Sequence, residues 1–464
     1  MKAVNILVVN INCNKGGTLE NIYLNKLHLE PPKGLLNDPN GLSYFRGKYY
    51  VFHQWNRFGL NHSYKEWGLF TSTDLLEWKH EGSALLPDTI EDKDGIYSGS
   101  AMVYKDQLYL FYTGNIKNNG IRKSFQKVAI SKDGIRFLKN PGFTTPSGLS
   151  EHHRDPKVFR YQDLWWMIVG SQMTSKKGVI ALYQSKNLMD WTYEGVFFAD
   201  ERLDQMCECP DLLDFQSKQV LICSPQKRDV VTDSAISSYS AYILGFVKAK
   251  KFEPISNFML LDYGFDFYAP QTFKDPKGRY IMLAWMSRMT DEEEEKCPTK
   301  HFGYLHCLTM PRELILKDDQ LIQRPLEEIL NTQKLLKIDS NSKFSMMQNS
   351  EILSIEINFK EDVNHLSVIL ADEVELIVDT SYLTLKRKSW VDDSVQEKGL
   401  ELTSLKKLEI FLDMSAIEIF INDGQKVMSL RYFPKTISKK HIINCQSKHL
   451  TKVSSLNIGG KNGK

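Results

Sequence analysis

The sequence predicts an all-β protein, in which a five-bladed β-propeller is followed by a C-terminal β-sandwich. Five similar units recur at intervals of 54 to 61 residues, each unit contains short apolar strands joined by polar turns, and the pattern changes after Arg324-Pro325. Repeats of this length with several strands per unit are typical of propeller blades. We therefore predict a propeller over residues 25–325, a linker over 326–337 and a sandwich over 338–464.

A hairpin is the element that recurs in all five units. The second strands of the hairpins begin 59, 57, 54 and 61 residues apart. Each is preceded by a polar turn, which is the usual sequence signal of a hairpin. In a propeller the first strand of each blade lines the central channel, so the first strand of every hairpin is expected to lie innermost. The second strands begin at Tyr50, Tyr109, Trp166, Val220 and Ile281.

A serine-initiated segment repeats in the first three units with the same phase. Ser72, Ser131 and Ser185 are 59 and 54 residues apart, and an aromatic residue follows each serine by six positions. Because this spacing matches the spacing of the hairpins, the two patterns support one repeat. An open all-β sandwich would not explain such a regular period.

The C-terminal part has a different pattern. A short helical stretch from Leu326 to Lys337 is interpreted as the linker. From Leu353 to Phe359 apolar and polar residues alternate, which is typical of a strand with one buried face. No cluster of chemically active residues stands out in this part. We expect the sandwich to cover the flank of the propeller or to support a homodimer.

Composition excludes several classes of protein. The 464 residues include 59 basic and 57 acidic side chains, so the net charge of +2 favours neither nucleic acid nor an anionic membrane as partner. Seven cysteines are too few and too scattered for a disulfide framework and fit a reducing compartment. The apolar run near Met1 is short and is interrupted by Asn5 and Asn10, which argues against a secretory signal. We expect a cytoplasmic protein without a membrane span.

Three acidic residues have equivalent positions in the repeat. They lie 11 or 12 residues before the second hairpin strands of the first, third and fourth units, at the predicted start of the innermost strands. Taken singly, each has a structural explanation as a turn residue, a surface ion pair or a loop residue. Together they predict three carboxyl groups that meet at the mouth of one channel. These residues are Asp38, Asp155 and Glu208.

Glycoside hydrolysis is the chemistry that best accounts for such a cluster. It requires one protonated carboxyl group as proton donor and one ionised carboxylate at the reacting carbon. Crowding of negative charge raises the pKa of one acid and so separates the two roles. Arg154 is expected to keep the adjacent Asp155 ionised and to bind sugar hydroxyls. Aromatic and amide side chains suited to a sugar are nearby: Gln54, Trp55, Trp67 and Tyr268.

Specific strings identify a family that this sequence resembles. The chain is similar to glycoside hydrolase family 32, the invertase family, and within it to the bacterial enzymes that hydrolyse sucrose 6-phosphate. The similarity runs from about His28 to Leu326 and again from about Asp413 to Pro434. The strings that carry it are residues 36–41 (LNDPNG), 97–101 (YSGSA), 154–156 (RDP), 208–212 (ECPDL), 261–271 (LDYGFDFYAPQ) and 308–314 (LTMPREL).

The resemblance implies a role for each acid. Asp38 would be the nucleophile, Asp155 would stabilise the transition state through fructosyl hydroxyls, and Glu208 would be the acid/base. The family's mechanism is retaining, so the carboxyl groups of Asp38 and Glu208 should lie about 5–5.5 Å apart. The substrate is a small sugar, and no metal or organic cofactor is implied. The candidate substrate-binding residues are Asn37, Gln54, His62, Ser98, Gly99 and Arg154.

Some positions depart from the family pattern, and some alternatives stay open. Leu35, Leu69 and Cys207 replace residues that are commonly Trp, His and aromatic, which could narrow the pocket or lower activity. The same acids would also serve a fructan hydrolase or a fructosyltransferase, whereas a non-catalytic sugar-binding propeller would be expected to have lost an acid. The sequence leaves open whether the substrate carries a 6-phosphate. Lys65, Arg122 and Lys123 are the candidates for its recognition.

Overall fold

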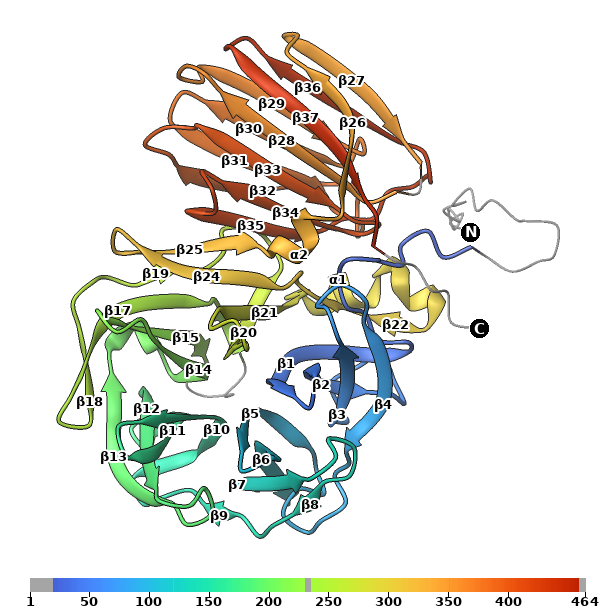
Figure 1. Cartoon of the computed structure of the whole chain (residues 1–464). Coiled ribbons are helices and arrows are strands. Elements are labelled where there is room, and N and C mark those ends of the chain that lie inside the picture. Colours follow the sequence, from blue (N-terminus) through green and yellow to red (C-terminus); the bar gives the residue numbers. More distant parts are fainter. Residues whose placement is uncertain (1–19, 120, 230–234, 350, 459–464) are drawn as a thin grey trace.

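A computed structural model describes residues 20–119, 121–229, 235–349 and 351–458. The N-terminal run that bears on the signal-peptide prediction, Cys13, and the last six residues of the predicted sandwich lie outside these ranges. The described strands form seven sheets, of which five surround a central axis and two pack face to face beside them (Figure 1). The predicted class, a β-propeller followed by a β-sandwich, is confirmed.

The first two propeller sheets come from the first two sequence units. The first sheet has the order β22-β1-β2-β3-β4, and the second has the order β5-β6-β7-β8 with β9 paired to β7. Their strands are β1 (Gly34–Phe45), β2 (Lys48–Asn56), β3 (Glu66–Ser72), β4 (Lys79–Leu85), β22 (Tyr304–Leu305), β5 (Ile96–Tyr104), β6 (Gln107–Asn118), β7 (Ile121–Ser131), β8 (Leu138–Lys139) and β9 (Phe143–Thr144).

The remaining three propeller sheets follow in chain order. Their strands are β10 (Leu149–Tyr161), β11 (Leu164–Met173), β12 (Gly178–Ser185) and β13 (Thr192–Ala199); β14 (Met206–Asp214), β15 (Gln219–Arg228), β16 (Ala235–Ser238), β17 (Ala241–Lys248), β18 (Lys251–Pro254) and β19 (Met259–Leu260); and β20 (Phe267–Lys274), β21 (Tyr280–Met286), β23 (Cys307–Leu308), β24 (Arg312–Lys317) and β25 (Gln320–Pro325). Three short helical segments also belong to this part: η1 (Glu201–Leu203), α1 (Asp291–Glu295) and η2 (Pro298–Phe302).

The repeated serine segments fold into the same tight turn. In each turn the serine Oγ accepts hydrogen bonds from the two N–H groups two and three residues later, and the Asp or Asn Oδ1 accepts from the next two. The third residue after each serine has a left-handed backbone, with φ of 65° at Leu75, 76° at Gly134 and 68° at Leu188. The sequence period therefore corresponds to a repeated hydrogen-bonding unit.

A strand from the last unit closes the ring. β22 pairs in parallel with β1, where Gly34 faces Tyr304 and Leu35 faces Leu305. The N–H of Gly34 also donates to the carbonyl oxygen of Gly303 at 2.8 Å. Gly34 has φ +76°, and a Cβ there would lie 2.1 Å from the carbonyl oxygen of Asn56, so the crossing requires glycine. The ends of the propeller are thus joined through backbone pairing.

Polar contacts tie neighbouring innermost strands together along the axis. Gly99 N–H donates to Asn40 Oδ1 at 2.9 Å, and Ser100 Oγ donates to the carbonyl oxygen of Pro156 at 2.8 Å. Farther round the ring, Asp211 Oδ2 accepts from Lys157 Nζ at 2.8 Å and from Thr272 Oγ1 at 2.7 Å. Lys157 and Asp211 are 9% and 0% exposed. This ion pair fills the axis where it passes the third, fourth and fifth sheets.

The two sandwich sheets enclose one apolar core. One has the order β26-β37-β28-β33-β34-β35 and the other β27-β36-β29-β30-β31-β32. Their strands are β26 (Gln333–Asp339), β27 (Lys343–Gln348), β28 (Leu353–Phe359), β29 (His365–Leu370), β30 (Val374–Asp379), β31 (Tyr382–Lys388), β32 (Val395–Glu401), β33 (Lys407–Leu412), β34 (Ala416–Ile421), β35 (Lys426–Arg431), β36 (Lys439–Cys445) and β37 (His449–Leu456). The alternation predicted from Leu353 to Phe359 is that of β28.

The linker is shorter than the predicted helical stretch of residues 326–337. Its helix, α2 (Glu327–Leu330), has only four residues. β26 begins at Gln333 and pairs with β37, so the second part of the predicted helix, from Gln333 to Lys337, belongs to an edge strand of the sandwich. The backbone groups of this segment form hydrogen bonds with β37, and these bonds outweigh the local preference for a helix.

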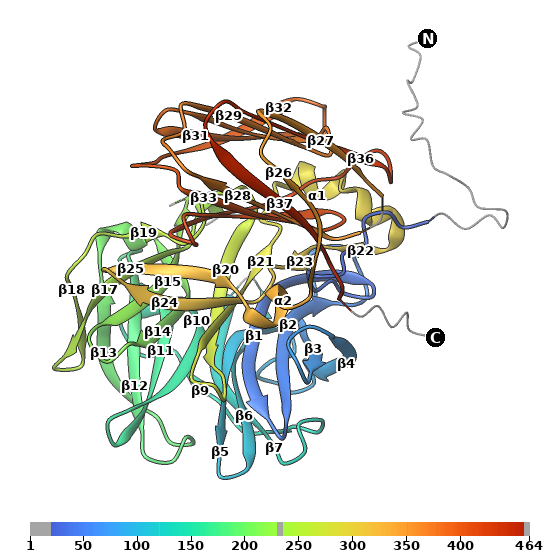
Figure 2. The same ribbon diagram turned by 45° about the horizontal axis from the view of Figure 1, so that its top comes forward.

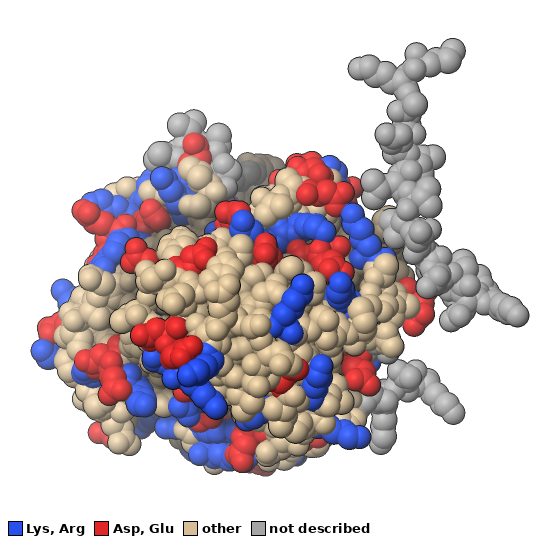
Figure 3. Space-filling view, turned by 90° about the horizontal axis from the view of Figure 1, so that it is seen from above, with Lys and Arg blue, Asp and Glu red and all other residues tan. Residues whose placement is uncertain are grey.

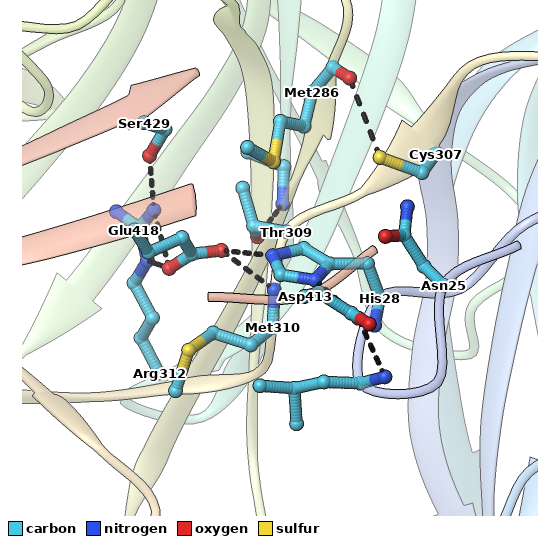
Figure 4. Close-up of polar contacts among 12 residues, drawn as sticks. Asn25, His28, Met286, Cys307, Thr309, Met310, Arg312, Asp413, Glu418 and Ser429 are labelled. Carbon is cyan, nitrogen blue, oxygen red and sulfur yellow. Dashed lines mark hydrogen bonds and ion pairs between the residues drawn. The ribbon is translucent and has the colours of Figure 1, made fainter. Parts of the chain in front are cut away.

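A buried polar cluster joins the N-terminal segment, the propeller and the sandwich (Figure 4). His28 lies between Asp413, whose Oδ2 is 3.0 Å from Nδ1, and Glu418, whose Oε1 is 3.2 Å from Nε2. Glu418 Oε2 also accepts from Arg312 Nε at 2.8 Å. Hydrogen bonds to the two carboxylates outweigh burial and raise the pKa of His28 to about 9. We refer to His28, Arg312, Asp413 and Glu418 as the junction cluster.

Acidic and basic side chains are interspersed over the face seen in Figure 3. The six cysteines within the described residues are all buried and free. Among those residues, no helix has the length and apolar character needed to cross a membrane.

Candidate active site

The three predicted acids lie on innermost strands, at interruptions of the strand pairing. Asp38 is in β1, Asp155 in β10 and Glu208 in β14. The acids lie inside these strands and not at their first residues, because each strand is paired both before and after the irregularity. A shift of register occurs at the corresponding place in all five innermost strands: Leu36/Pro39, Tyr97/Gly99, Arg154/Lys157, Glu208/Asp211 and Tyr268/Gln271.

Bulges of this kind redirect side chains and are common beside active sites. Asp155, Cys209 and Ala269 take up the irregularity with left-handed φ values of 68°, 45° and 49°. Such values are costly for residues other than glycine, so the surrounding sheets must impose them. The bulges therefore explain how the strands can continue while their side chains meet at the axis.

Asp38 is held by a chain of hydrogen bonds that begins at a lysine. Lys65 Nζ donates to Gln54 Oε1 at 2.8 Å, Gln54 Nε2 donates to Ser98 Oγ at 2.7 Å, and Ser98 donates to Asp38 Oδ2 at 2.5 Å. Asn37 Nδ2 lies 3.3 Å from Asp38 Oδ1 and 2.7 Å from Gln54 Oε1. Burial raises the pKa of Asp38, while Lys65 and Ser98 oppose the increase.

Glu208 is held by one cation and one phenol. Arg154 Nη2 and Nε donate to Glu208 Oε1 at 2.7 and 3.1 Å, and Tyr268 OH donates to Oε2 at 2.6 Å. Burial favours the neutral acid, but the Arg154 charge and the Tyr268 hydrogen bond prevail and lower the pKa of Glu208. The Glu208 side chain is 18% exposed, so it remains open to solvent on one side.

Asp155 is the most enclosed of the three acids. It is 4% exposed, and its Oδ2 accepts from the N–H of Cys209 at 3.0 Å. Its own N–H donates to Thr113 Oγ1 at 3.1 Å. Burial raises the pKa of Asp155 to about 7, and repulsion from Glu208 adds to this effect.

Arg154, which was expected to keep Asp155 ionised, lowers the pKa of Asp155 without offsetting burial, and it forms its hydrogen bonds with Glu208 instead. Arg154 Nε is 4.0 Å from Asp155 Oδ2, whereas the guanidinium is within hydrogen-bonding distance of Glu208. Neighbouring side chains on a strand point in different directions, and the left-handed backbone at Asp155 adds to this divergence. The pKa of Asp155, like that of Asp38, is raised, whereas the pKa of Glu208 is lowered.

The predicted substrate-binding residues fall into two groups. Asn37, Gln54, Ser98 and Arg154 contact the acids or each other, as described above. Gly99 is used for packing, because its N–H donates to Asn40 and a Cβ there would lie 1.9 Å from the carbonyl oxygen of Phe111. His62 stands apart from the acids, with a side chain 40% exposed and Nε2 3.1 Å from Glu294 Oε1.

Sequence reasoning missed several residues of the site. Thr113 and Trp285 occupy the position of Gln54 in their units, four residues after the start of the second hairpin strand, so the repeat could have identified them. No comparable signal marks Glu294 or His306, which lie outside the repeat. Among the described residues, no group of three His, Cys, Asp or Glu side chains is arranged to hold a metal ion.

Comparisons with known proteins cover nearly the whole chain. Residues 28–325 match glycosyl hydrolases family 32 N-terminal domain, and residues 326–459 match glycosyl hydrolases family 32 C terminal. The chain is 38% identical over 424 residues to a sucrose-6-phosphate hydrolase of Bacillus subtilis, covering 88% of each chain. It is 34% identical over 453 residues to a raffinose invertase of Escherichia coli, covering 93% of each.

Solved structures show the same similarity. A sucrose-6-phosphate hydrolase from Lactobacillus gasseri superposes with a TM-score of 0.82 at 29% identity over 94% of each chain. A Bombyx mori β-fructofuranosidase superposes with a TM-score of 0.80 at 26% identity, again over 94% of each chain.

Proposed function

The chain belongs to glycoside hydrolase family 32, and on that premise we propose that it is a retaining β-fructofuranosidase that cleaves sucrose or sucrose 6-phosphate. It is a glycoside hydrolase, and the products would be fructose and either glucose or glucose 6-phosphate. The observation that carries the proposal is the meeting of Asp38, Asp155 and Glu208 at bulges of three innermost strands, with different partners for each acid.

The different partners suit the acids to different tasks. Asp38 accepts hydrogen bonds from Ser98 and Asn37, which orient its carboxylate without an ion pair that would quench it as a nucleophile. Glu208 is fixed by Tyr268 and Arg154, an arrangement that suits a group that must give up a proton and later recover it. Asp155 presents a buried carboxyl group that can accept hydrogen bonds from sugar hydroxyls.

Proton donation requires a proton on Glu208, which the lowered pKa of this group does not favour. The raised pKa of Asp155, about 7, keeps a proton on that group in the buried acid pair near neutral pH. Sugar hydroxyls that donate to Asp155 would stabilise its ionised form and so shift the proton to Glu208. In this proposal, substrate binding itself prepares the acid.

The reaction then proceeds in two displacements. Asp38 forms a bond to the anomeric carbon of the fructosyl unit while the bond to the glycosidic oxygen breaks and Glu208 protonates that oxygen. The ionised Glu208 next takes a proton from water, whose oxygen attacks the same carbon and releases Asp38. Two inversions give retained configuration.

Time-resolved NMR of sucrose cleavage tests this proposal. The fructose first formed should be the β-furanose anomer, which later equilibrates; the α anomer as the first product would contradict the retaining mechanism. A protein that cleaves neither sucrose nor sucrose 6-phosphate would contradict the function itself.

Recognition of a 6-phosphate is the finer question of substrate. Lys65 lies beside Asp38 but already donates to Gln54, and the guanidinium of Arg122 lies 5.8 Å from the Tyr97 ring centre. We propose that the phosphorylated sugar is the better substrate, supported by the relatives named sucrose-6-phosphate hydrolase. Comparing kcat/KM for the two sugars with the same enzyme preparation decides between them.

Location and assembly are also proposals. The free buried cysteines fit a reducing compartment, which supports a cytoplasmic enzyme. Exposed apolar residues on the sandwich edge strands support a homodimer formed there; they are Leu335, Leu336, Ile338 and Met347. Light scattering of the purified protein measures the assembly directly.

A further inference from the structure

Two segments extend from the end of the propeller at which the acids lie. Leu35 near the start of β1 pairs with Asn56 at the end of β2, and Phe267 at the start of β20 pairs with Met286 at the end of β21. Residues 57–65 and 287–303, which follow β2 and β21, therefore leave the first and fifth sheets on the acid side. The second segment contains α1, which begins after the capping residue Thr290.

Two successive glutamates of α1 face different partners. Glu293 Oε1 accepts from Arg387 Nη2 at 3.2 Å and from Gln396 Nε2 at 2.9 Å, both on sandwich strands. Trp390 Nε1 donates to the carbonyl oxygen of Glu293 at 2.9 Å. α1 is thereby attached to the sandwich, and it lies where the two parts of the molecule meet (Figure 2).

Glu294 contacts two histidines of the propeller instead. Its Oε1 accepts from His62 Nε2 at 3.1 Å and is 3.3 Å from His306 Nε2. The Glu294 side chain is 16% exposed, and its contacts with the two imidazoles hold its pKa well below the usual range. An ionised, largely buried carboxylate between two histidines fixes the rings that it contacts.

A line of ring contacts leads from this carboxylate to Glu208. Trp285 Nε1 donates to His306 Nδ1 at 3.2 Å. The ring centres of Trp285 and Tyr268 are 6.4 Å apart, and Tyr268 donates to Glu208. His62 also contacts Trp285, with ring centres 6.1 Å apart. Glu294 therefore lies on the same side of the site as the acid/base.

The direction in which a substrate can extend follows from the filled axis. Lys157 and Asp211 lie two and three residues beyond Asp155 and Glu208 on their strands, at about 3.3 Å per residue, and Thr272 of β20 contacts Asp211. They block that direction. A leaving group protonated by Glu208 must therefore point toward the acid end, where His62 is exposed.

We propose that Glu294 is a positioning residue on the leaving-group side of the site and that it holds His62 against the glucosyl unit. The sandwich in turn fixes Glu294 in place through Glu293. This inference rests on the proposed function. It also gives the C-terminal sandwich a part in substrate binding without any sandwich residue that touches the sugar.

The test is the steady-state kinetics of Glu294→Gln, measured with whichever of sucrose and sucrose 6-phosphate the wild type cleaves faster. Loss of an interaction made equally in the ground and transition states raises KM alone, so we expect KM to rise about 10-fold and kcat to change less than about twofold. Glu292→Gln is the matched control, because Glu292 lies on the same helix, is exposed and pairs only with Lys296 at the surface.

Two further variants separate positioning from general loss of structure. His62→Ala should raise KM to the same extent, and the double variant with Glu294→Gln should add less than about twofold, because residues that act together are not additive. Trp390→Phe keeps the ring but removes the donor to Glu293, and it should raise KM about twofold to threefold.

The outcomes are distinguishable. An unchanged KM in Glu294→Gln, or fully additive effects with His62→Ala, would overturn the inference while the wild type remains active. An equal rise of KM in Glu292→Gln would also overturn it. Failure of the wild type to cleave either sugar concerns the proposed function instead.

Discussion

Two buried clusters of carboxylates with basic partners differ in how their charges are matched. In the junction cluster each carboxylate pairs with His28 or Arg312, and the pKa values of Asp413 and Glu418 are lowered. At the active site three carboxylates face Arg154 and Lys65, and the pKa values of Asp38 and Asp155 are raised. The matched cluster is expected to stabilise the fold, whereas the unmatched one retains a proton that catalysis can use.

Replacement of the proposed nucleophile should give the largest effect and should affect only the active site. Asp38→Asn removes the attacking carboxylate but keeps its size, so we expect kcat for sucrose cleavage to fall about 10⁴-fold or more. The melting temperature should not fall, because one of three crowded acids is neutralised. Retained activity in this variant would refute the assignment of Asp38.

A comparable change in the junction cluster should affect stability instead. Glu418→Gln leaves Arg312 and His28 buried with one carboxylate fewer, and we expect the free energy of unfolding to fall by about 3–5 kcal/mol. Urea titration measures this loss. Below the melting range kcat should stay within about twofold of wild type. A large loss of kcat in the folded variant would mean that the two clusters are not independent.

The junction cluster should also make stability depend on pH above neutrality. Because the pKa of His28 is about 9 in the folded protein, against an ordinary value of 6.5 for the unfolded chain, its contribution is complete below about pH 6.5 and is lost as the pH rises through 9. We expect a loss of roughly 3 kcal/mol over this interval, since each pKa unit equals about 1.4 kcal/mol.

Denaturant titrations at several pH values test the assignment to His28. His28→Gln should be less stable at pH 6 and should lose most of the pH dependence. His365→Gln is the matched control, because His365 is half-exposed and pairs with Asp379 on the surface of the sandwich. A wild-type slope in His28→Gln would show that another group titrates.

The smallest expected effect is a gain in the free energy of unfolding, not a loss. The raised pKa of Asp155 means that its ionisation opposes folding, by an amount that grows from about pH 4 to about pH 7 and is constant above. Asp155→Asn should therefore be more stable than wild type by roughly 1–3 kcal/mol at pH 7.5, and equally stable at pH 4. A variant less stable than wild type at pH 7.5 would contradict the comparison of the two clusters.

The repeat in the sequence predicted which strands carry the acids, because that depends on strand order. It did not predict the partners of individual side chains, because these depend on local backbone geometry. Strand period and hairpin turns were sufficient to place Asp38, Asp155 and Glu208 on innermost strands. The partner of Arg154 could not be predicted, because it depends on a left-handed residue within a bulge. The contact of His62 with Glu294 joins two segments outside the repeat. The predicted helix after Leu326 becomes a strand from Gln333 onward, because pairing with β37 is a tertiary interaction.

The closure of the ring by β22 has a consequence for synthesis of the protein. β1 lacks its second pairing partner, β22, until Tyr304 and Leu305 have left the ribosome, and His28 lacks its acidic partners until Asp413 and Glu418 have followed. We expect nascent chains to stay sensitive to protease until both events have occurred, even though all three acids have by then been made. The N-terminal part of the chain, although it is synthesised first, would thus be the last part to reach its final packing.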